Sequence, residues 1–211
     1  MKHEEAVKEL LVNNTISVIA KGGFEMATVR NLTRFVGDIP GVKMNDAYIY
    51  RFFGSKENLY AAAFVRLDSE LFYNFCKAFK LVSDDTDESL TLKDRILKFL
   101  SMAWEYITHD EERCRCYVRY YYSIYFDRES IQRHNELYSG IITEIAKSFK
   151  NEADVAAIIH SVFTTMFDFA IRVFNGQLVN DDTNKPHVLN VLYCMMSTYL
   201  KDVPDSLGVK E

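Results

Sequence analysis

The 211-residue sequence is 48% hydrophobic and carries a formal net charge of −5. A chain of this length and composition can bury a substantial core, which excludes disorder as its main state. Only eight glycines and three prolines interrupt its runs of helix-forming residues, so we expect an all-α protein. The charge is uneven, with a sum of +1 over residues 1–60 and −6 over residues 61–211. The acidic total does not favour nucleic-acid binding, but the near-neutral N-terminal part permits it through a few placed cations.

The sequence shows no clear signal for export, membrane insertion or metal binding. The N-terminal stretch holds no apolar run of signal-peptide length, and no segment approaches about 18 continuous apolar residues. We therefore expect a cytoplasmic protein with no membrane span. The four cysteines form no C-x-x-C pair and no clear zinc spacing, which predicts reduced, mostly buried thiols. We also expect no metal and no cofactor. Cys114 and Cys116 form a C-x-C that could bind a soft metal, although two ordinary helix residues are the simpler interpretation.

The first 82 residues predict four helices with recognisable ends. The hydrophobic periodicity indicates helices over residues 4–21, 29–35, 46–53 and 56–82. Thr28, Asn45 and Ser55 are expected N-caps, because their side-chain oxygens can accept hydrogen bonds from free backbone N–H groups. Gly23 and Gly54 are expected to end the helices that precede them.

The rest of the chain predicts five more helices. They are expected over residues 92–109, 111–126, 129–149, 152–175 and 186–201. The polar, acidic stretch "SDDTDESLT" connects them to the long fourth helix. Because no flexible linker is present, we place the domain boundary at the start of that helix, with domains over residues 1–55 and 56–211.

The third predicted helix has two different faces. One face carries the large apolar residues Ile49, Phe52 and Phe53, which can anchor to a core. The other face exposes Ala47, Tyr50 and Arg51, with Asp46 and Tyr48 on the flanks. Two short helices joined by a turn, the second exposing a small residue, a tyrosine and an arginine, are typical of the helix-turn-helix motif, whose second helix enters the major groove of DNA.

Lys56 stands in the first turn of the fourth helix, where a cation opposes the helix macrodipole at a cost of up to about 1 kcal/mol. A DNA phosphate bound at the free N–H groups beside Ser55 would supply the missing negative charge. Thr28 and Tyr50 can also contact the DNA backbone, while Arg51 can address guanine. The predicted DNA-binding residues are Thr28, Arg30, Lys43, Asn45, Asp46, Ala47, Tyr48, Tyr50, Arg51 and Lys56.

The stretches "TISVIAKGGFEMATVRNLTRFVG" and "NDAYIYRFFGSKENLYAAAF" closely resemble the DNA-binding region of the TetR/AcrR family of bacterial transcriptional regulators. The resemblance covers about residues 8–64, and its matching residues are Gly23, Phe24, Thr28, Ile49, Tyr50, Phe53, Lys56, Glu57 and Leu59. It implies a three-helix helix-turn-helix unit joined by a long fourth helix to a C-terminal body that binds an effector and dimerises. It also implies a transcriptional regulator, usually a repressor, and not an enzyme.

The sequence departs from the family pattern in two places. Family members pass almost directly from Gly37 to the N-cap at Asn45, whereas this chain inserts "DIPGVK", Asp38 to Lys43. The longer turn can alter the angle of the recognition helix, or Lys43 can itself touch DNA. Phe52 stands where relatives often carry a histidine or tyrosine that hydrogen-bonds phosphate.

The helix over residues 152–175 is apolar almost all round, and the final helix has a similar apolar surplus. A helix that is apolar on every side must be covered on every side. In the resembling family the last two helices form a four-helix dimer interface, which implies a homodimer here; a monomeric core is the alternative. A two-fold dimer would space its recognition helices about 34 to 36 Å apart, or a multiple, on an inverted-repeat operator. Asp168 and Arg172 are expected to form an i, i+4 ion pair.

Aromatic residues cluster in "CYVRYYYSIYF", residues 116–126. Their polar tips suit a largely apolar ligand cavity, although the same residues can simply fill the core of the bundle. Within the resemblance they imply a small, largely apolar or aromatic effector. The candidate ligand-binding residues are Phe75, Trp104, Tyr117, Tyr121, Tyr125, Phe163, Met166 and Phe167.

Two other function classes are considered. "DDTDE", Asp84 to Glu88, has the D-D-x-x-E spacing of the magnesium–diphosphate motif of all-helical terpene synthases. No second metal-binding motif accompanies it, so a solvated acidic connector is the better interpretation. A helical small-molecule carrier or adaptor that has kept the fold and lost DNA binding is the third class, which the longer turn and Phe52 leave open.

Overall fold

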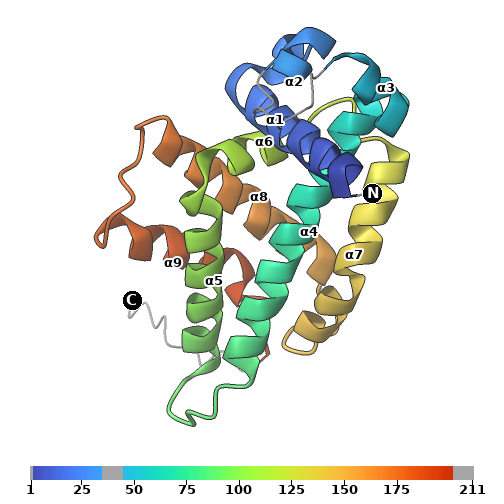
Figure 1. Ribbon diagram of the computed structural model, residues 1–211. Helices are drawn as coiled ribbons and strands as arrows, with labels where there is room; N and C mark the ends of the chain where they lie inside the picture. The colour runs from blue at the N-terminus through green and yellow to red at the C-terminus, as the bar shows by residue number, and fades with distance from the viewer. Residues whose placement is uncertain (1, 35–44, 202–211) are drawn as a thin grey trace. The chain divides into compact units, whose positions relative to one another are not determined.

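The computed structural model describes residues 2–34 and 45–201, and these residues form an all-α protein (Figure 1). The helices are α1 (Lys2–Met26), α2 (Val29–Arg34), α3 (Ala47–Phe53), α4 (Lys56–Ser83), α5 (Leu92–His109), α6 (Glu111–Tyr121), α7 (Arg128–Ala146), α8 (Val155–Phe174) and α9 (Asn184–Ser197). Each predicted helix is present, and the order along the chain is the expected one. The predicted turn insertion, Asp38 to Lys43, lies outside the described residues.

Two of the three predicted N-caps, Thr28 and Ser55, are present, whereas α3 begins at Ala47 with Asp46 and not Asn45 at its N-cap position. The backbone N–H of Asn31 donates to Thr28 Oγ1 (3.3 Å), and that of Asn58 donates to Ser55 Oγ (3.1 Å). Gly23 interrupts α1 with φ of 70°, in the left-handed region that disfavours side chains. These local signals position the starts of α2 and α4, where the sequence predicts phosphate contacts.

Some helices end earlier than predicted. α6 was expected to continue to Phe126 but ends at Tyr121, because Ser123 redirects the chain. The Ser123 hydroxyl donates to the Tyr120 carbonyl (2.8 Å) and accepts from the backbone N–H of Tyr125 (3.1 Å). A hydroxyl that bonds locally to the backbone in this way competes with continuation of a helix.

The chain divides into two compact units, and the first comprises Met1–Leu71 and Asp110–Asn135. In this unit α1 packs against α2 and α6. Its fully buried side chains include Leu11, Ile19, Leu32, Ile49, Leu59, Tyr60 and Tyr120. α6 therefore shares a core with the predicted DNA-binding helices. The boundary at residue 55 is a prediction about functional domains, and the packing units do not coincide with it.

The second unit comprises Phe72–His109 and Glu136–Glu211. Within it α5, α8 and α9 pack against one another around Leu100, Trp104, Met166 and Leu192, all fully buried. The indole Nε1–H of Trp104 donates to Asn180 Oδ1 (2.9 Å), which satisfies the buried ring nitrogen.

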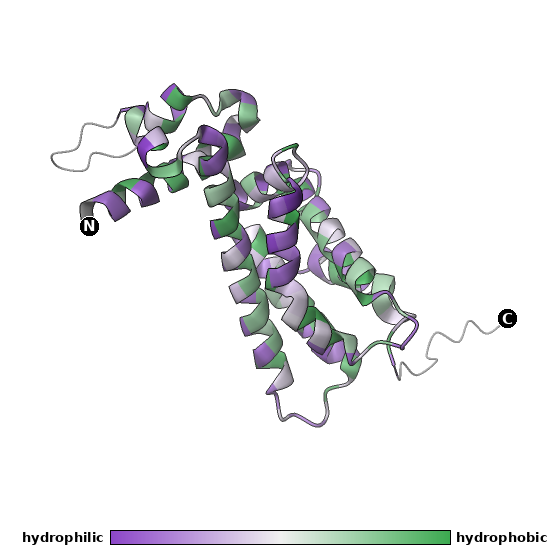
Figure 2. Cartoon of the chain, turned by 90° about the vertical axis from the view of Figure 1, so that its right-hand side faces the viewer, coloured by the Kyte–Doolittle hydropathy of each residue, from purple (hydrophilic) through white to green (hydrophobic). Residues whose placement is uncertain are grey.

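α8 is long and apolar enough, by length and composition alone, to cross a membrane, with a mean hydropathy of 1.4. Its sequence contains no unbroken apolar run of membrane-spanning length, because Ser161, Asp168 and Arg172 interrupt it. Asp168 and Arg172 form the expected i, i+4 ion pair, with Nη2 and Oδ2 2.8 Å apart. α8 packs against α5 and α9, but only 17% of this span is buried, so packing within the described part of one chain does not cover its apolar surface. Figure 2 shows how hydrophobic and hydrophilic residues distribute along the helices.

The side-chain carboxylates of the acidic connector between α4 and α5 make hydrogen bonds and an ion pair that hold the connector in place. Asp85 Oδ2 pairs with Lys98 Nζ (2.6 Å), and Asp87 Oδ1 accepts from the Ser89 hydroxyl (2.6 Å). These hydrogen bonds hold the pKa of both carboxyl groups below the usual range. Arg95 closes the loop by donating to the Val82, Asp85 and Asp87 carbonyls. The contacts of this segment fit a structural connector.

Candidate nucleic-acid interface

α3 presents the two faces that the sequence predicts. Ile49 is fully buried, while Phe52 and Phe53 are half-buried. On the opposite face Tyr50 is 55% exposed, and Ala47 and Arg51 are also exposed. The helix is therefore anchored by its apolar side and offers a small residue, a phenol and a guanidinium to solvent.

The junction of α2 and α3 is fixed by polar contacts. Thr33 Oγ1 donates to the carboxylate of Asp46 (3.0 Å), and Asn45 Oδ1 accepts from the backbone N–H of Ala47 (2.9 Å). Asn14, buried on α1, donates to the Leu32 carbonyl (2.5 Å) and thereby holds α2. Asn45 and Asp46, both among the predicted DNA-binding residues, thus have structural partners in the free protein.

Arg51 has a partner that the sequence analysis missed. Its Nη2 lies 2.5 Å from the carboxylate Oε1 of Glu4 on α1, and its guanidinium lies over the Phe52 ring at 5.3 Å. The Lys8 ammonium lies 5.7 Å from the centroid of the same ring. Tyr48, another of the predicted DNA-binding residues, stacks on Phe52 with ring centroids 5.6 Å apart. Phe52 is therefore a platform for cations and for Tyr48.

Two contacts at the start of α4 partly explain why a lysine stands at position 56. Lys56 Nζ lies 3.8 Å from Glu57 Oε1 and 5.9 Å from the centroid of the Tyr60 ring. Both contacts offset the unfavourable interaction with the helix macrodipole. The side chain of Lys56 is still 40% exposed, so its ammonium remains accessible to a phosphate.

The amino ends of α2 and α4 are tied together through Tyr60. Its hydroxyl donates to the carbonyl of Ala27 (2.5 Å), the residue before the Thr28 cap. Burial, with smaller effects from Tyr125 and Glu57, raises the pKa of Tyr60 to about 12. This bond brings the predicted phosphate contacts at Thr28 and Lys56 to one part of the first unit. Arg30 is exposed on α2, and Lys43 lies outside the described residues.

The eight candidate ligand-binding residues fall into two groups, one in each unit. Tyr117, Tyr121 and Tyr125 belong to the first unit, where rings of α1, α4, α6 and the α6–α7 connection form a cluster. Tyr125 packs on Phe24, with ring centroids 4.6 Å apart, and Tyr117 stacks on Tyr121 at 5.9 Å. Burial raises the pKa of Tyr121. These tyrosines contribute to the packing of the first unit.

The other five candidates lie in the second unit. Phe75 stacks on Phe163 with ring centroids 4.4 Å apart, and Phe99 meets Phe163 edge-on at 6.4 Å. Met166 is fully buried, as is Trp104, and Phe167 is 8% exposed. This group forms an apolar, aromatic interior around α8.

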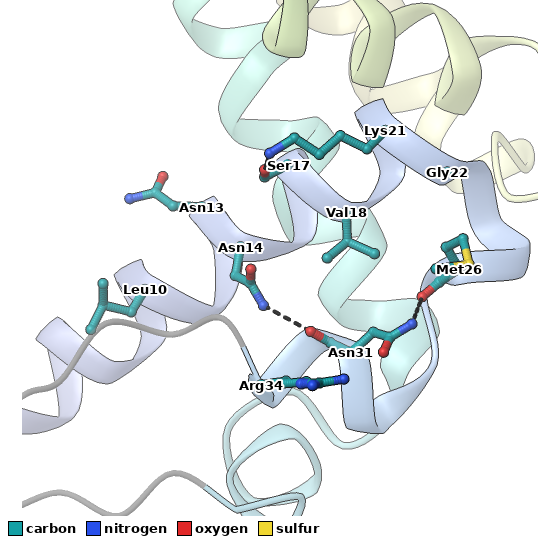
Figure 3. A pocket seen from close by; sticks show the side chains of 10 residues that line it. All are labelled: Leu10, Asn13, Asn14, Ser17, Val18, Lys21, Gly22, Met26, Asn31 and Arg34. Atoms are coloured by element: carbon teal, nitrogen blue, oxygen red, sulfur yellow. Dashed lines mark hydrogen bonds between the residues drawn. The ribbon is translucent and has the colours of Figure 1, made fainter.

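A hollow of about 690 Å³ lies between α1 and α2 in the first unit (Figure 3). Its lining mixes apolar side chains with amides and cations: Leu10, Asn13, Asn14, Ser17, Val18, Lys21, Gly22, Met26, Asn31 and Arg34. The amide Nδ2 of Asn31 donates to the Met26 carbonyl across it (2.8 Å). None of the candidate ligand-binding residues lines this hollow.

Several solved structures share this architecture. A TetR-family transcription regulator from Marinobacter aquaeolei VT8 matches with a TM-score of 0.74 and 14% identity, over 92% of this chain and 97% of that chain. A TetR-family protein from Shewanella sp. PV-4 gives 0.69 and 12%, over 92% and 98%. The regulator FadR from Bacillus subtilis, solved with stearoyl-CoA, gives 0.58 and 19%, over 87% and 96%. No protein-family model and no curated protein matches the sequence.

The structural likeness covers nearly the whole of each chain, and the neighbours are named as transcription regulators. At identities of 12–19% such a likeness shows the fold and not the function. The chain therefore has the fold of TetR-family transcription regulators, in agreement with the resemblance found in residues 8–64.

Proposed function

We propose that this protein is a sequence-specific DNA-binding transcriptional regulator that acts in the cytoplasm as a homodimer. The single observation that carries the proposal is the arrangement of α3, which is anchored by buried Ile49 and exposes Ala47, Tyr50 and Arg51. A second helix of a helix-turn-helix with this face fits the major groove. Ala47 permits close approach of the helix to the groove.

The contacts in the proposed complex separate into two kinds. Lys56 and Thr28, at the amino ends of α4 and α2, would bind phosphates together with the free N–H groups of those helix ends. Tyr50 would add a third backbone contact. Arg51 would read guanine through its two parallel donors once it leaves Glu4. The first kind positions the protein, and the second gives sequence preference.

The proposed dimer uses α8 and α9. On α9 Val191 is 46% exposed, and on α8 the alanines at 156 and 157 are also exposed. Apolar side chains left uncovered in one chain can be covered by a second copy. A two-fold axis would then place the two α3 helices on the half-sites of an inverted repeat.

The proposed regulator is a repressor that a small, largely apolar or aromatic effector releases from DNA. The aromatic interior around Phe75, Phe163 and Met166 has the composition of such a site. The regulator from Bacillus subtilis that shares this fold was solved with stearoyl-CoA, which makes a long-chain acyl-CoA a rational first probe. α4 carries Lys56 at one end and Phe75 further along, so a tilt of α4 could couple the two sites. Release requires that the effector bind the non-docking conformation more tightly.

Selection from a random duplex library tests the proposal. The purified chain should enrich an inverted repeat whose half-sites are about 10 base pairs apart, or a multiple, and contain a guanine that Arg51→Ala no longer requires. No enrichment from any library would contradict DNA binding and favour a ligand-binding protein that has lost it. An effector that binds tightly yet leaves operator affinity unchanged would contradict the coupling through α4.

A further inference from the structure

We propose that Glu4 is an intramolecular competitor of DNA for Arg51 and thereby sets the affinity of the protein for its operator. The inference rests on the proposed function, because it concerns the residue assigned to guanine reading. It begins from the ion pair between Arg51 Nη2 and Glu4 Oε1, which joins α3 to α1 across 47 residues of sequence. No property of α3 alone would place a carboxylate there.

The Glu4 carboxylate offers Arg51 the same kind of acceptor that DNA does. A carboxylate accepts from a guanidinium with the planar geometry that a phosphate or the O6 and N7 atoms of guanine also provide. The Arg51 Nη2 atom carries two N–H groups, and the one that donates to Glu4 Oε1 cannot donate to guanine at the same time. Docking on guanine through that N–H therefore requires that the pair with Glu4 first break.

The surroundings of the pair make it more than a chance surface contact. The Arg51 guanidinium is held over the half-buried Phe52 ring, which restricts its orientation and reduces the entropy lost when the pair forms. Lys8 lies over the same ring and stands four residues after Glu4 on α1. When Arg51 leaves, the Glu4 carboxylate still has a cation at the favourable i, i+4 spacing.

The relative strengths of the Arg51–Glu4 pair and the Arg51–guanine contact decide whether DNA displaces Glu4. The side chains of Arg51 and Glu4 are 62% and 46% exposed, and an exposed pair of this kind changes an equilibrium constant by about five-fold or less. A bidentate contact with guanine discriminates by about five-fold to more than one hundred-fold. Operator DNA can therefore displace Glu4, but with an affinity lowered by the strength of the pair. A lowered operator affinity makes release by an effector easier.

The test compares Glu4→Gln with Glu5→Gln, which removes an equal charge from the same exposed turn of α1. Binding of the duplex selected from the library is measured by fluorescence anisotropy at one fixed salt concentration. Glu4→Gln should raise the affinity about two- to five-fold, and Glu5→Gln by less, because it acts only at long range through a screened field. In an Arg51→Gln background the two substitutions should have equal effects.

Three results would overturn the inference. They are equal effects of Glu4→Gln and Glu5→Gln in the natural sequence, an excess effect of Glu4→Gln that persists in the Arg51→Gln background, and a loss of affinity on Glu4→Gln, which would make Glu4 an aid to Arg51. In each of these the proposed function stands, because the unsubstituted chain binds DNA. If no variant binds the duplex while circular dichroism shows an intact helical fold, the proposed function fails and this inference falls with it.

Discussion

His134 Nδ1 on α7 lies 3.0 Å from the carboxylate Oδ1 of Asp68 on α4. The same carboxylate accepts a hydrogen bond from the Tyr117 hydroxyl on α6 (3.2 Å). The side chain of Asp68 is only 5% exposed, so this is a buried polar cluster that joins three helices of the first unit. We expect the cluster to stabilise the fold, because a buried carboxylate without partners has a high free-energy cost.

Replacement of His134 by alanine should strongly destabilise the protein. The substitution removes one hydrogen-bond partner of the buried Asp68 carboxylate, which keeps its bond from Tyr117, and a hydrogen bond to a charged group contributes about 1.5–3 kcal/mol. The free energy of unfolding, measured by urea titration at pH 7, should fall by that amount. Arg133→Ala is the matched control on the same helix, since its ion pair with Glu129 is exposed and contributes about 0.3–0.5 kcal/mol. Equal losses for the two variants would show that the cluster is not a stabilising feature.

Alkaline pH should weaken the fold through Tyr60. Its pKa is raised to about 12 in the folded protein from an ordinary value of 10.0, so between these values the unfolded chain loses the proton first. The contribution of Tyr60 is fully present below pH 10 and is lost as the pH rises toward 12. Between pH 9 and pH 11 the free energy of unfolding should fall by about 1 kcal/mol more in the natural sequence than in Tyr60→Phe. If the free energy of unfolding fell equally with pH in the two proteins, the burial of the Tyr60 phenol would be contradicted.

Lys56→Ala should reduce DNA affinity for all sequences and lower the salt dependence of binding. Loss of one phosphate contact reduces the slope of log Kobs against log salt concentration by about one unit. Titrations of the selected duplex and of a scrambled one at several salt concentrations measure this slope. Lys77→Ala removes an equal charge from an exposed position on the same helix and should leave the slope unchanged. An unchanged slope for Lys56→Ala would remove the start of α4 from the DNA interface.

Val191→Asp should convert the proposed dimer to a monomer. Val191 is 46% exposed on α9, and an aspartate buried in the proposed interface without a partner costs several kcal/mol. This corresponds to at least a hundred-fold weaker association, which light scattering after gel filtration detects. Val179→Asp is the control, because Val179 is 63% exposed and lies between α8 and α9. A dimer that survives Val191→Asp would place the interface elsewhere.

The sequence predicts best the features that depend on neighbours along the chain. The caps at Thr28 and Ser55 and the buried position of Ile49 are local consequences of hydroxyl chemistry and helical periodicity, and the structure agrees with them. The early end of α6 is a failure of the same local reasoning. An aromatic run continues past Tyr121, but Ser123 bonds to the backbone and stops the helix.

The contacts that give the candidate site its character are long-range and could not be predicted. Glu4 and Arg51 are 47 residues apart, and Asp68 and His134 are 66 residues apart. No periodicity within one helix reveals which helices meet. The i, i+4 spacing of Glu4 and Lys8 even favours a pair within α1. Only the tertiary contact between the first turn of α1 and α3 makes Arg51 the partner.

The central claim is that the exposed face of α3 docks on duplex DNA. Anisotropy titration of the library-selected duplex with the natural chain and with a Tyr50→Ala/Arg51→Ala variant tests it most directly. We predict submicromolar binding by the natural chain, at least about ten-fold weaker binding by the variant, and similar melting temperatures, because both side chains are exposed. Equal affinity of the two folded proteins for the duplex would contradict the claim.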